Sequence, residues 1–227
     1  MKNVSCIIPA YNEEARIGIV LQTVSKSSYI KEIIVVDDCS TDNTAEVVKK
    51  FSHVKLLSHS KNEGKSKAVY HGIQNASGDF ILLLDADLTG LTPSDIDLLI
   101  EPVIKNKVDV SISLRGNAPL VWRIIGIDYI SGERVFPRSF FDHHMANIEH
   151  LSGFALEVFF NKLLIDQKSN IAIVRWKNVS SPYKYRKYGW IKGVRADTRM
   201  MIEIFKTISP LSAVKQIYIM RKRSTII

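Results

Sequence analysis

The sequence has few of the features that mark a secreted or membrane-spanning protein. Its only cysteines, Cys6 and Cys39, stand beside expected strands and form no Cys-x-x-Cys pair. Such usage indicates a reducing compartment and excludes a thiolate metal site. The apolar run before Pro9 is shorter than the core of a signal peptide, and no run reaches the roughly 18 apolar residues of a membrane span. We therefore expect a cytoplasmic protein that is soluble or bound to a membrane surface.

The first expected strand-to-helix turn lacks a Gly-x-Gly-x-x-Gly sequence, which excludes the usual pyrophosphate cradle of a dinucleotide-binding fold. Acidic residues are also scarce, because 31 Lys and Arg stand against 23 Asp and Glu, giving a net charge of +8. This charge favours an anionic partner such as a phosphate-bearing molecule or a lipid surface. No recognised nucleic-acid module accompanies it, so we expect no nucleic-acid partner.

Short apolar runs alternate with amphipathic stretches in the first half of the chain. This alternation predicts βαβ units, hence an α/β fold with a mainly parallel sheet flanked by helices. The expected strands lie at 4–9, 32–37, 54–58, 80–85 and 108–114, and the expected helices at 14–24, 44–51, 65–75 and 95–104.

Carboxylates follow directly on one of these buried strands. Residues 80–90 read FILLLDADLTG, so Asp85 and Asp87 point to the same side of the chain, where their charges repel unless a cation lies between them. Tyr11 and Asp38 also follow expected strands, and ligands of parallel sheets bind at that edge. Carboxylate oxygens suit Mg²⁺ or Mn²⁺, so a divalent cation is expected here. Taken singly, each acidic residue could instead cap a helix or end a strand.

Four segments in this half resemble successive motifs of the family 2 glycosyltransferases, which have the GT-A fold. They are VSCIIPAYNEEARI, IKEIIVVDDCSTDNT, NEGKSKAVYHGI and GDFILLLDADL. The resemblance is to the branch of dolichol-phosphate and polyprenyl-phosphate hexosyltransferases. It implies a GT-A catalytic domain over residues 1–200.

The resemblance also implies roles for single residues. Asp85 and Asp87 match the DXD motif, which binds the metal and the donor diphosphate. Thr89 replaces a common glutamine, which leaves the third metal ligand open. The remaining matches would bind the nucleotide-sugar: Pro9, Tyr11 and Glu13 in the nucleotide pocket, Asp38 at the base and Lys65 nearby.

The segment SGERVFPR is similar to a Ser-Gly-phe-Arg segment of the same branch, with Glu133 where an aromatic residue is more common. Arg115, Arg134 and Arg138 are therefore candidate ligands for donor or acceptor phosphates, since a guanidinium group matches phosphate geometry. Arg134 is expected to orient the attacking phosphate. The alternative is a solvated basic face.

Glu157 resembles the acidic position of a Gly-phe-x-x-Glu segment in this branch, and with Asp87 and Arg134 it completes the expected catalytic set. Transfer to a hydroxyl group needs a general base, whereas an acceptor phosphate is already an anionic nucleophile. Glu157 could instead be a structural partner of an arginine. We do not favour a metal site at the histidines of this region, which are His143, His144 and His150.

Positive charge is concentrated towards the C-terminus, where residues 162–227 contain fifteen Lys and Arg and three acidic residues. We expect residues 201–227 to form basic amphipathic helices that lie in a membrane interface, with Arg221, Lys222 and Arg223 binding anionic lipid. The same apolar stripe could pack on the catalytic domain or on a second subunit of a homodimer. It comprises Met201, Ile204, Phe205, Ile208, Leu211, Val214 and Tyr218.

The expected function is metal-dependent transfer of a hexose from a UDP- or GDP-sugar to a polyprenyl phosphate, at the cytoplasmic face of a membrane. Two alternatives stay open at this stage. One is the same chemistry on a soluble phosphorylated or glycan acceptor. The other is a protein that binds nucleotide-sugars without turnover, which the Thr89 and Glu133 departures allow.

Overall fold

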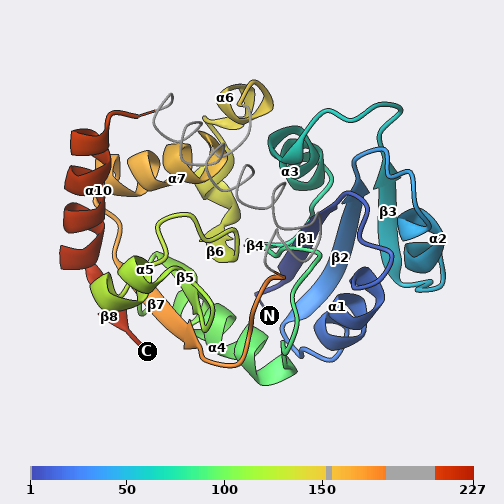
Figure 1. Cartoon of the computed structure of the whole chain (residues 1–227), viewed down its shortest axis with the longest axis horizontal. Coiled ribbons are helices and arrows are strands. Elements are labelled where there is room, and N and C mark those ends of the chain that lie inside the picture. The colour runs from blue at the N-terminus through green and yellow to red at the C-terminus, as the bar shows by residue number, and fades with distance from the viewer. Residues whose placement is uncertain (1, 152–154, 183–207) are drawn as a thin grey trace.

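A computed structural model describes the chain at residues 2–151, 155–182 and 208–227. One twisted sheet runs through the molecule, with helices on both of its faces (Figure 1). The strands are β1 (Val4–Ala10), β2 (Ile30–Asp37), β3 (Val54–Ser58), β4 (Phe80–Leu83), β5 (Val110–Arg115), β6 (Arg134–Pro137), β7 (Ile171–Trp176) and β8 (Ser224–Ile226). The helices are α1 (Ile17–Val24), α2 (Thr44–Lys49), α3 (Lys65–Gln74), α4 (Pro93–Ile104), α5 (Leu120–Ile125), the 3-10 helix η1 (Arg138–Phe141), α6 (Met145–Glu149), α7 (Ala155–Asp166) and α10 (Pro210–Lys222).

The strand order is β3-β2-β1-β4-β6-β5-β7-β8. All neighbouring pairs are parallel except those made by β6, which is antiparallel to both β4 and β5. The mainly parallel sheet predicted from the sequence is confirmed. Parallel strands covered on both faces read as continuous apolar runs, which is why β1, β2 and β4 were recognisable from the sequence.

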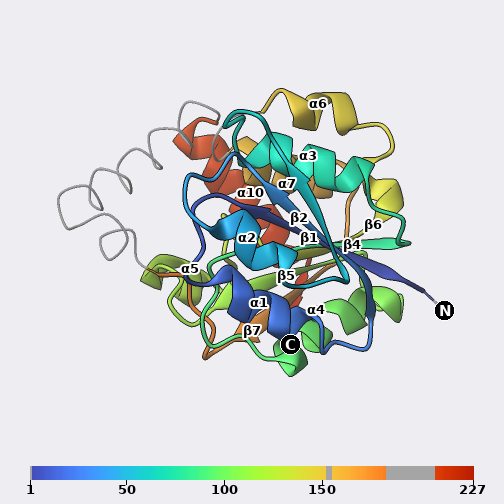
Figure 2. The ribbon, with the colours of Figure 1, turned by 90° about the vertical axis from the view of Figure 1, so that its right-hand side faces the viewer.

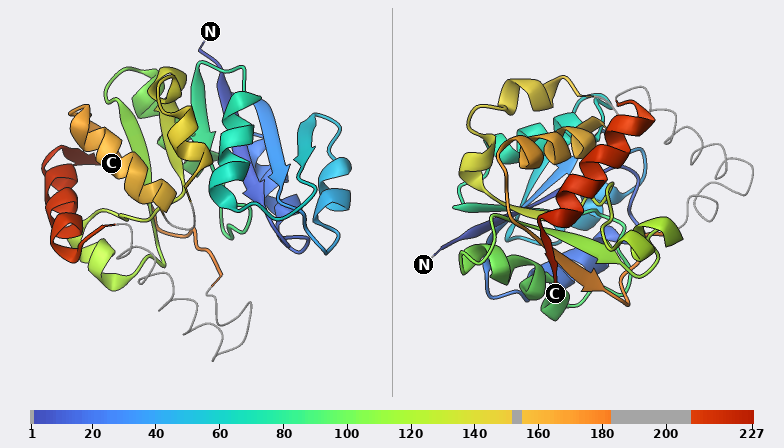
Figure 3. Two further views of the ribbon diagram at one scale, coloured as in Figure 1. Left: turned by 90° about the horizontal axis from the view of Figure 1, so that it is seen from above. Right: turned by 90° about the vertical axis from the view of Figure 1, so that its left-hand side faces the viewer.

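Two apolar cores lie on opposite faces of the sheet. One contains side chains from α3, α6 and α7, and the other contains side chains from α1, α2 and α4. Figure 2 and the right-hand view of Figure 3 look along the sheet from its two sides and show these helices as two layers with the strands between them.

Strand β6 reverses direction relative to its neighbours, and this decides where two of the predicted arginines lie. Leu83 pairs with Arg134, and Phe80 pairs with Pro137. Arg134 is therefore at the carboxyl end of β4, beside Asp85. Arg138 is at the amino end, where its backbone N–H donates to Asp79 O.

The C-terminal segment is built into the same sheet and core. Strand β8 pairs with β7, and Met220 of α10 is buried in the core that α3 and α7 share. The opposite side of α10 exposes Leu211, Val214 and Tyr218. The division at residue 200 stays a prediction. Met201, Ile204 and Phe205 of the predicted stripe lie outside the described residues.

Candidate active site

The predicted site residues gather at the carboxyl edge of β1, β2 and β4. A cleft of about 290 Å³ opens there. The predicted residues that line it are Pro9, Tyr11, Glu13, Asp38, Lys65, Asp85 and Asp87. Tyr11 is 44% exposed, so its ring is accessible from solvent. Residues that are up to 78 positions apart in the sequence (9 to 87) thus line one cleft.

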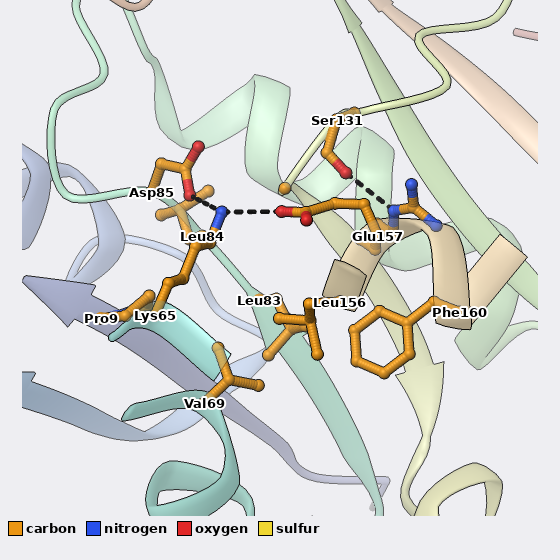
Figure 4. Close-up of a pocket in the computed structure, with 12 residues that line it drawn as sticks. Pro9, Lys65, Val69, Leu83, Leu84, Asp85, Ser131, Leu156, Glu157 and Phe160 are labelled. Atoms are coloured by element: carbon orange, nitrogen blue, oxygen red, sulfur yellow. Dashed lines mark hydrogen bonds and ion pairs between the residues drawn. The ribbon is translucent and has the colours of Figure 1, made fainter. Parts of the chain in front are cut away.

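Lys65 links a carboxylate that lines this cleft, Asp85, to one that lies outside its lining, Glu157. Its Nζ lies 2.9 Å from Asp85 Oδ1 and 3.0 Å from Glu157 Oε1, and Figure 4 shows the ammonium group between them. Burial alone would lower the pKa of Lys65, but the two carboxylates outweigh it and raise that pKa above its ordinary value. Lys65 is therefore a fixed positive charge, and it joins the first turn of α3 to the end of β4 and to α7.

Glu157 is almost completely buried, with 3% of its side chain exposed. Its Oε1 accepts from Lys65, while its Oε2 has no hydrogen-bond partner among the described residues. A buried carboxylate oxygen without a donor is costly. The geometry thus pairs Glu157 with a lysine, whereas the sequence suggested an arginine as its structural partner.

The backbone of Gly132 lies directly against the ion pair of Lys65 and Asp85. A Cβ atom at this position would lie 2.7 Å from Lys65 Nζ and 2.8 Å from Asp85 Oδ1, closer than carbon approaches such atoms. Glycine is required here because the backbone approaches the charged pair directly. Gly132 was not among the site residues predicted from the sequence, although it lies in the quoted SGERVFPR segment.

Glu133, which stands where an aromatic residue is more common in the family, has a structural role inside the protein. It is fully buried and accepts hydrogen bonds from Ser113 Oγ at 2.7 Å and Ser131 Oγ at 2.8 Å. Burial raises the pKa of Glu133 against the charge of Arg115, and the neighbouring charge of Asp85 raises that pKa as well. Burial would also raise the pKa of Asp85, but Lys65 and Arg115 lower it. Asp85 is thus the ionised member of the pair, the state that binds a cation.

Arg115, at the end of β5, contacts two buried carboxylates on one side and is partly exposed to solvent on the other. Its guanidinium lies 3.4 Å from carboxylate oxygens of Asp128 and Glu133, and 13% of the side chain is exposed. Asp128 was not recognised from the sequence, because its spacing from Arg115 follows no motif. Arg115 also lines a second cavity, of about 550 Å³, with three further cations, Arg123, Arg175 and Lys177.

Arg134 lies inside the protein. It is 0% exposed, and it donates to Ser131 O at 2.8 Å, to Asn161 Oδ1 at 2.7 Å and to Tyr129 O at 3.2 Å. A phosphate could reach this guanidinium only if those partners moved. The geometry therefore disagrees with the expected phosphate contact and makes Arg134 an internal hydrogen-bond donor.

Arg138 is exposed, but it lies at the amino end of β4, on the edge of the sheet opposite to Asp85. The expectation that it binds a substrate phosphate in this cleft is inconsistent with that position. The sequence could not show this, because the direction of β6 is set by its sheet partners.

Asp38 lines the cleft with its carboxylate already engaged. Its two oxygens accept from the backbone N–H groups of Glu63 and Gly64, each at 2.8 Å, and Oδ1 lies 2.8 Å from His59 Nδ1. The base contact implied for Asp38 stays a prediction, and a base would share the carboxylate with these donors. Thr89 is also engaged, because its Oγ1 lies 3.0 Å from Ser180 O.

The two arginines of β6 and η1 allow a matched test of their different positions. We expect Arg134→Met to lower the free energy of unfolding by about 3–5 kcal/mol, because it leaves buried acceptors without donors. Arg138→Met should change it by less than about 0.5 kcal/mol, as is usual for exposed sites. Urea unfolding followed by circular dichroism measures both. Equal effects of the two substitutions would contradict the internal role of Arg134.

Comparison with known proteins agrees with this geometry. The family model of glycosyl transferase family 2 matches residues 5–160. The dolichol-phosphate mannosyltransferase of Pyrococcus furiosus is 39% identical over 117 residues, covering 49% of this chain and 33% of the relative. The undecaprenyl-phosphate 4-deoxy-4-formamido-L-arabinose transferase of Yersinia enterocolitica is 36% identical over 109 residues, covering 44% and 33%. The chain spans between a third and somewhat over half of the length of such curated relatives.

Among solved structures, glucosyl-3-phosphoglycerate synthase from Mycobacterium tuberculosis has a similar fold. The TM-score is 0.69 at 22% identity, covering 91% of this chain and 80% of that one. The predicted GT-A fold is confirmed by this similarity. With the family model matching more than half of its residues, the chain belongs to glycosyl transferase family 2.

Proposed function

We propose that the protein transfers a hexose from a UDP- or GDP-sugar to a polyprenyl phosphate, using a divalent cation. The observation that carries this proposal is the cleft at the carboxyl edge of the sheet, where Asp85 and Asp87 stand beside the cationic Lys65 and the accessible ring of Tyr11. An acidic pair and a cation in one cleft suit a metal-bound diphosphate. Relatives named for dolichol-phosphate and undecaprenyl-phosphate transfer support the acceptor class.

Asp85 and Asp87 fit a hard divalent cation. Both line the cleft, and Asp85 is 24% exposed and held ionised by its neighbours. Their carboxylate oxygens are the ligands that Mg²⁺ and Mn²⁺ prefer, and such an ion would neutralise charge on the leaving diphosphate. The related synthase structure contains Mn²⁺ and uridine diphosphate, which supports the same donor chemistry here.

The cavity beside Arg115 is our candidate acceptor site. Its cations Arg115, Arg123, Arg175 and Lys177 stand next to apolar side chains of α5, including the 76%-exposed Ile124. Guanidinium groups bind phosphate oxygens in a bidentate manner. A site that combines positive charge with exposed apolar surface suits a phosphate carried on a lipid. The acceptor phosphate would then attack as an anion, without a general base.

We further propose that Glu157 positions Lys65 and does not itself take a proton from the acceptor. Its Oε1 lies 3.0 Å from Lys65 Nζ, and only 3% of its side chain is exposed. Lys65 would in turn keep Asp85 ionised and face the donor phosphates. Positioning of the reactants and neutralisation of their charges are the main sources of catalysis expected for this reaction.

Contact with a membrane surface is proposed for α10 and α5. Leu211, Val214 and Tyr218 are 81%, 64% and 68% exposed on α10, and Leu120 is 68% exposed on α5. Arg221 Nε donates to Ile125 O, which fixes the end of α10 beside α5. Arg221 and Arg223 both donate to backbone carbonyls, so they are less free to bind lipid than expected. No helix among the described residues is long and apolar enough to cross a membrane.

A soluble phosphorylated acceptor is the second candidate. It is favoured by the fold similarity to a synthase whose structure holds glucosyl-3-phosphoglycerate, a product built on a small phosphorylated acid. The same basic cavity would then bind the phosphate of a small molecule. The third possibility is that the protein binds nucleotide-sugar without transferring the sugar. The assay below distinguishes it from both candidates.

Substrate class is tested with radiolabelled UDP- and GDP-hexoses, Mg²⁺ or Mn²⁺, and polyprenyl phosphate. We expect label to enter the organic phase, and we expect EDTA to prevent it. Asp87→Asn should lower the rate by about 10²-fold or more, because one hard ligand of the cation is lost. Label confined to a water-soluble phosphorylated product would move the acceptor to the second candidate. Binding of nucleotide-sugar without any product would contradict both.

Glu157→Gln separates positioning from base catalysis. The amide keeps an oxygen for Lys65 but removes the charge, so we expect the rate of transfer to fall by about tenfold with an unchanged pH profile. Loss of a general base would cost about 10²–10⁴-fold and remove the basic limb of that profile. The measurement is the transfer rate against pH for both proteins, at saturating donor.

Membrane contact is tested by flotation with vesicles that contain anionic lipid. We expect Leu211→Glu with Val214→Glu to reduce the bound fraction at least several-fold, because charge on this face opposes insertion. Ile19→Glu is the matched control, since Ile19 is 63% exposed on α1 and distant from α10. Equal binding of all three proteins would rule out the proposed face.

A further inference from the structure

Two histidines and a glutamate lie close together next to Asp38, a residue that lines the cleft. They are separate from the acidic pair Asp85 and Asp87. His59 follows β3, Glu63 lies in the loop that leads to α3, and His71 is on α3. One ligand atom from each lies within 4.8 Å of the others. His59 Nε2 and His71 Nδ1 are 2.8 Å apart. These residues come from different elements, so the fold brings them together.

The His59 ring is oriented by Asp38. Its Nδ1 lies 2.8 Å from Asp38 Oδ1, and 6% of the side chain is exposed. A carboxylate at Nδ1 favours the tautomer with its proton there, which leaves the Nε2 lone pair directed at His71. Histidine ligands of metals are commonly held in this way by a second carboxylate.

Glu63 is the third candidate ligand, and its carboxylate lies between Lys67 and the His59 ring. Its Oε1 lies 3.3 Å from Lys67 Nζ, whereas its Oε2 is the oxygen nearer to His59, at 3.9 Å from Nδ1. Lys67 also has a second carboxylate nearby, since its Nζ is 3.7 Å from Glu149 Oε1. Because Glu63 Oε2 lies nearest to Nδ1 of His59, the Glu63 side chain has to turn towards Nε2 to bind the same ion as the two histidines.

We propose that His59, Glu63 and His71 bind a divalent cation of the zinc class, at a site separate from the hard-cation site at Asp85 and Asp87. Two imidazole nitrogens with one carboxylate and an open position are a common ligand set for zinc, whereas Mg²⁺ prefers oxygen ligands alone. Zn–N bonds of about 2.0–2.1 Å in tetrahedral geometry place the nitrogens about 3.3 Å apart. Binding therefore separates the two nitrogens by about 0.5 Å from their present 2.8 Å, and both rings turn so that their lone pairs meet at the ion.

Such an ion would fix the loop that shapes the cleft. The loop between His59 and Lys65 supplies the backbone N–H groups of Glu63 and Gly64 to Asp38. Lys65, the cation of the cleft, follows directly. Metal binding would tie this loop to α3 and to Asp38 together. An effect on donor affinity rests on the proposed function, whereas the metal site itself does not.

The test is a titration of the full chain with Co²⁺, after treatment with EDTA and without nucleotide. Co²⁺ in four-coordinate sites gives intense visible absorption, which octahedral oxygen sites do not. We expect one equivalent of Co²⁺ to produce this absorption. Added Zn²⁺ should displace the Co²⁺ and abolish the absorption, whereas Mg²⁺ should have no effect. His71→Gln and His59→Gln should abolish it. His53→Gln is the matched control, because His53 is exposed and outside the cluster, and Asp87→Asn should also retain the absorption.

An independent readout is the unfolding temperature, because a ligand that binds the folded state raises it. At about 100-fold excess over its dissociation constant, Zn²⁺ should raise the unfolding temperature of the wild-type chain by roughly 5–10 °C. His71→Gln should lose most of that shift. Absence of four-coordinate absorption in the wild-type chain, or its persistence in both cluster variants, would overturn the site. Neither measurement depends on sugar transfer, so failure of the proposed function would leave the result intact.

Discussion

The ammonium group of Lys65 is the contact on which the rest of the site depends. It joins Asp85 at the end of β4 to Glu157 on α7, and Lys65 itself begins α3. Without it, the carboxyl groups of Asp85 and Glu157 would face one another with no cation between them, and burial would favour their protonation. Buried ion pairs often contribute little net stability, because desolvation offsets the attraction. The value of this one is geometric, since it fixes an ionised Asp85 where a cation can bind.

Arg115 separates two regions of opposite character along the sheet edge. On one side are the acidic side chains of the cleft, and on the other is the basic cavity with Arg123, Arg175 and Lys177. Glu133 and Asp128 hold the Arg115 guanidinium between them. In the proposed function, a donor diphosphate with its cation would occupy the first region and an acceptor phosphate the second. The net charge of +8 is thus unevenly distributed, with the acidic residues of the site collected beside β4.

The sequence was informative where local pattern and function coincide. Buried parallel strands produce apolar runs, and the polar residues after them must lie at one edge of the sheet. Tyr11, Asp38, Asp85 and Asp87 were located in this way, and the structure brings them into one cleft. The exposed stripe of α10 was visible too, but its pattern could not show that Met220 on the other side enters the main core.

By itself, the sequence determined the mainly parallel sheet, the polar residues at its carboxyl edge and the family resemblance. These follow from periodicity and short motifs within contiguous segments. Tertiary structure decided the rest. The reversal of β6 buried Arg134 and moved Arg138 to the far edge, since strand direction depends on the neighbouring strands. Packing also buried Glu133 against Ser113, Ser131 and Arg115, and it placed His59 beside His71. Such contacts join residues distant along the chain, and no local pattern encodes them.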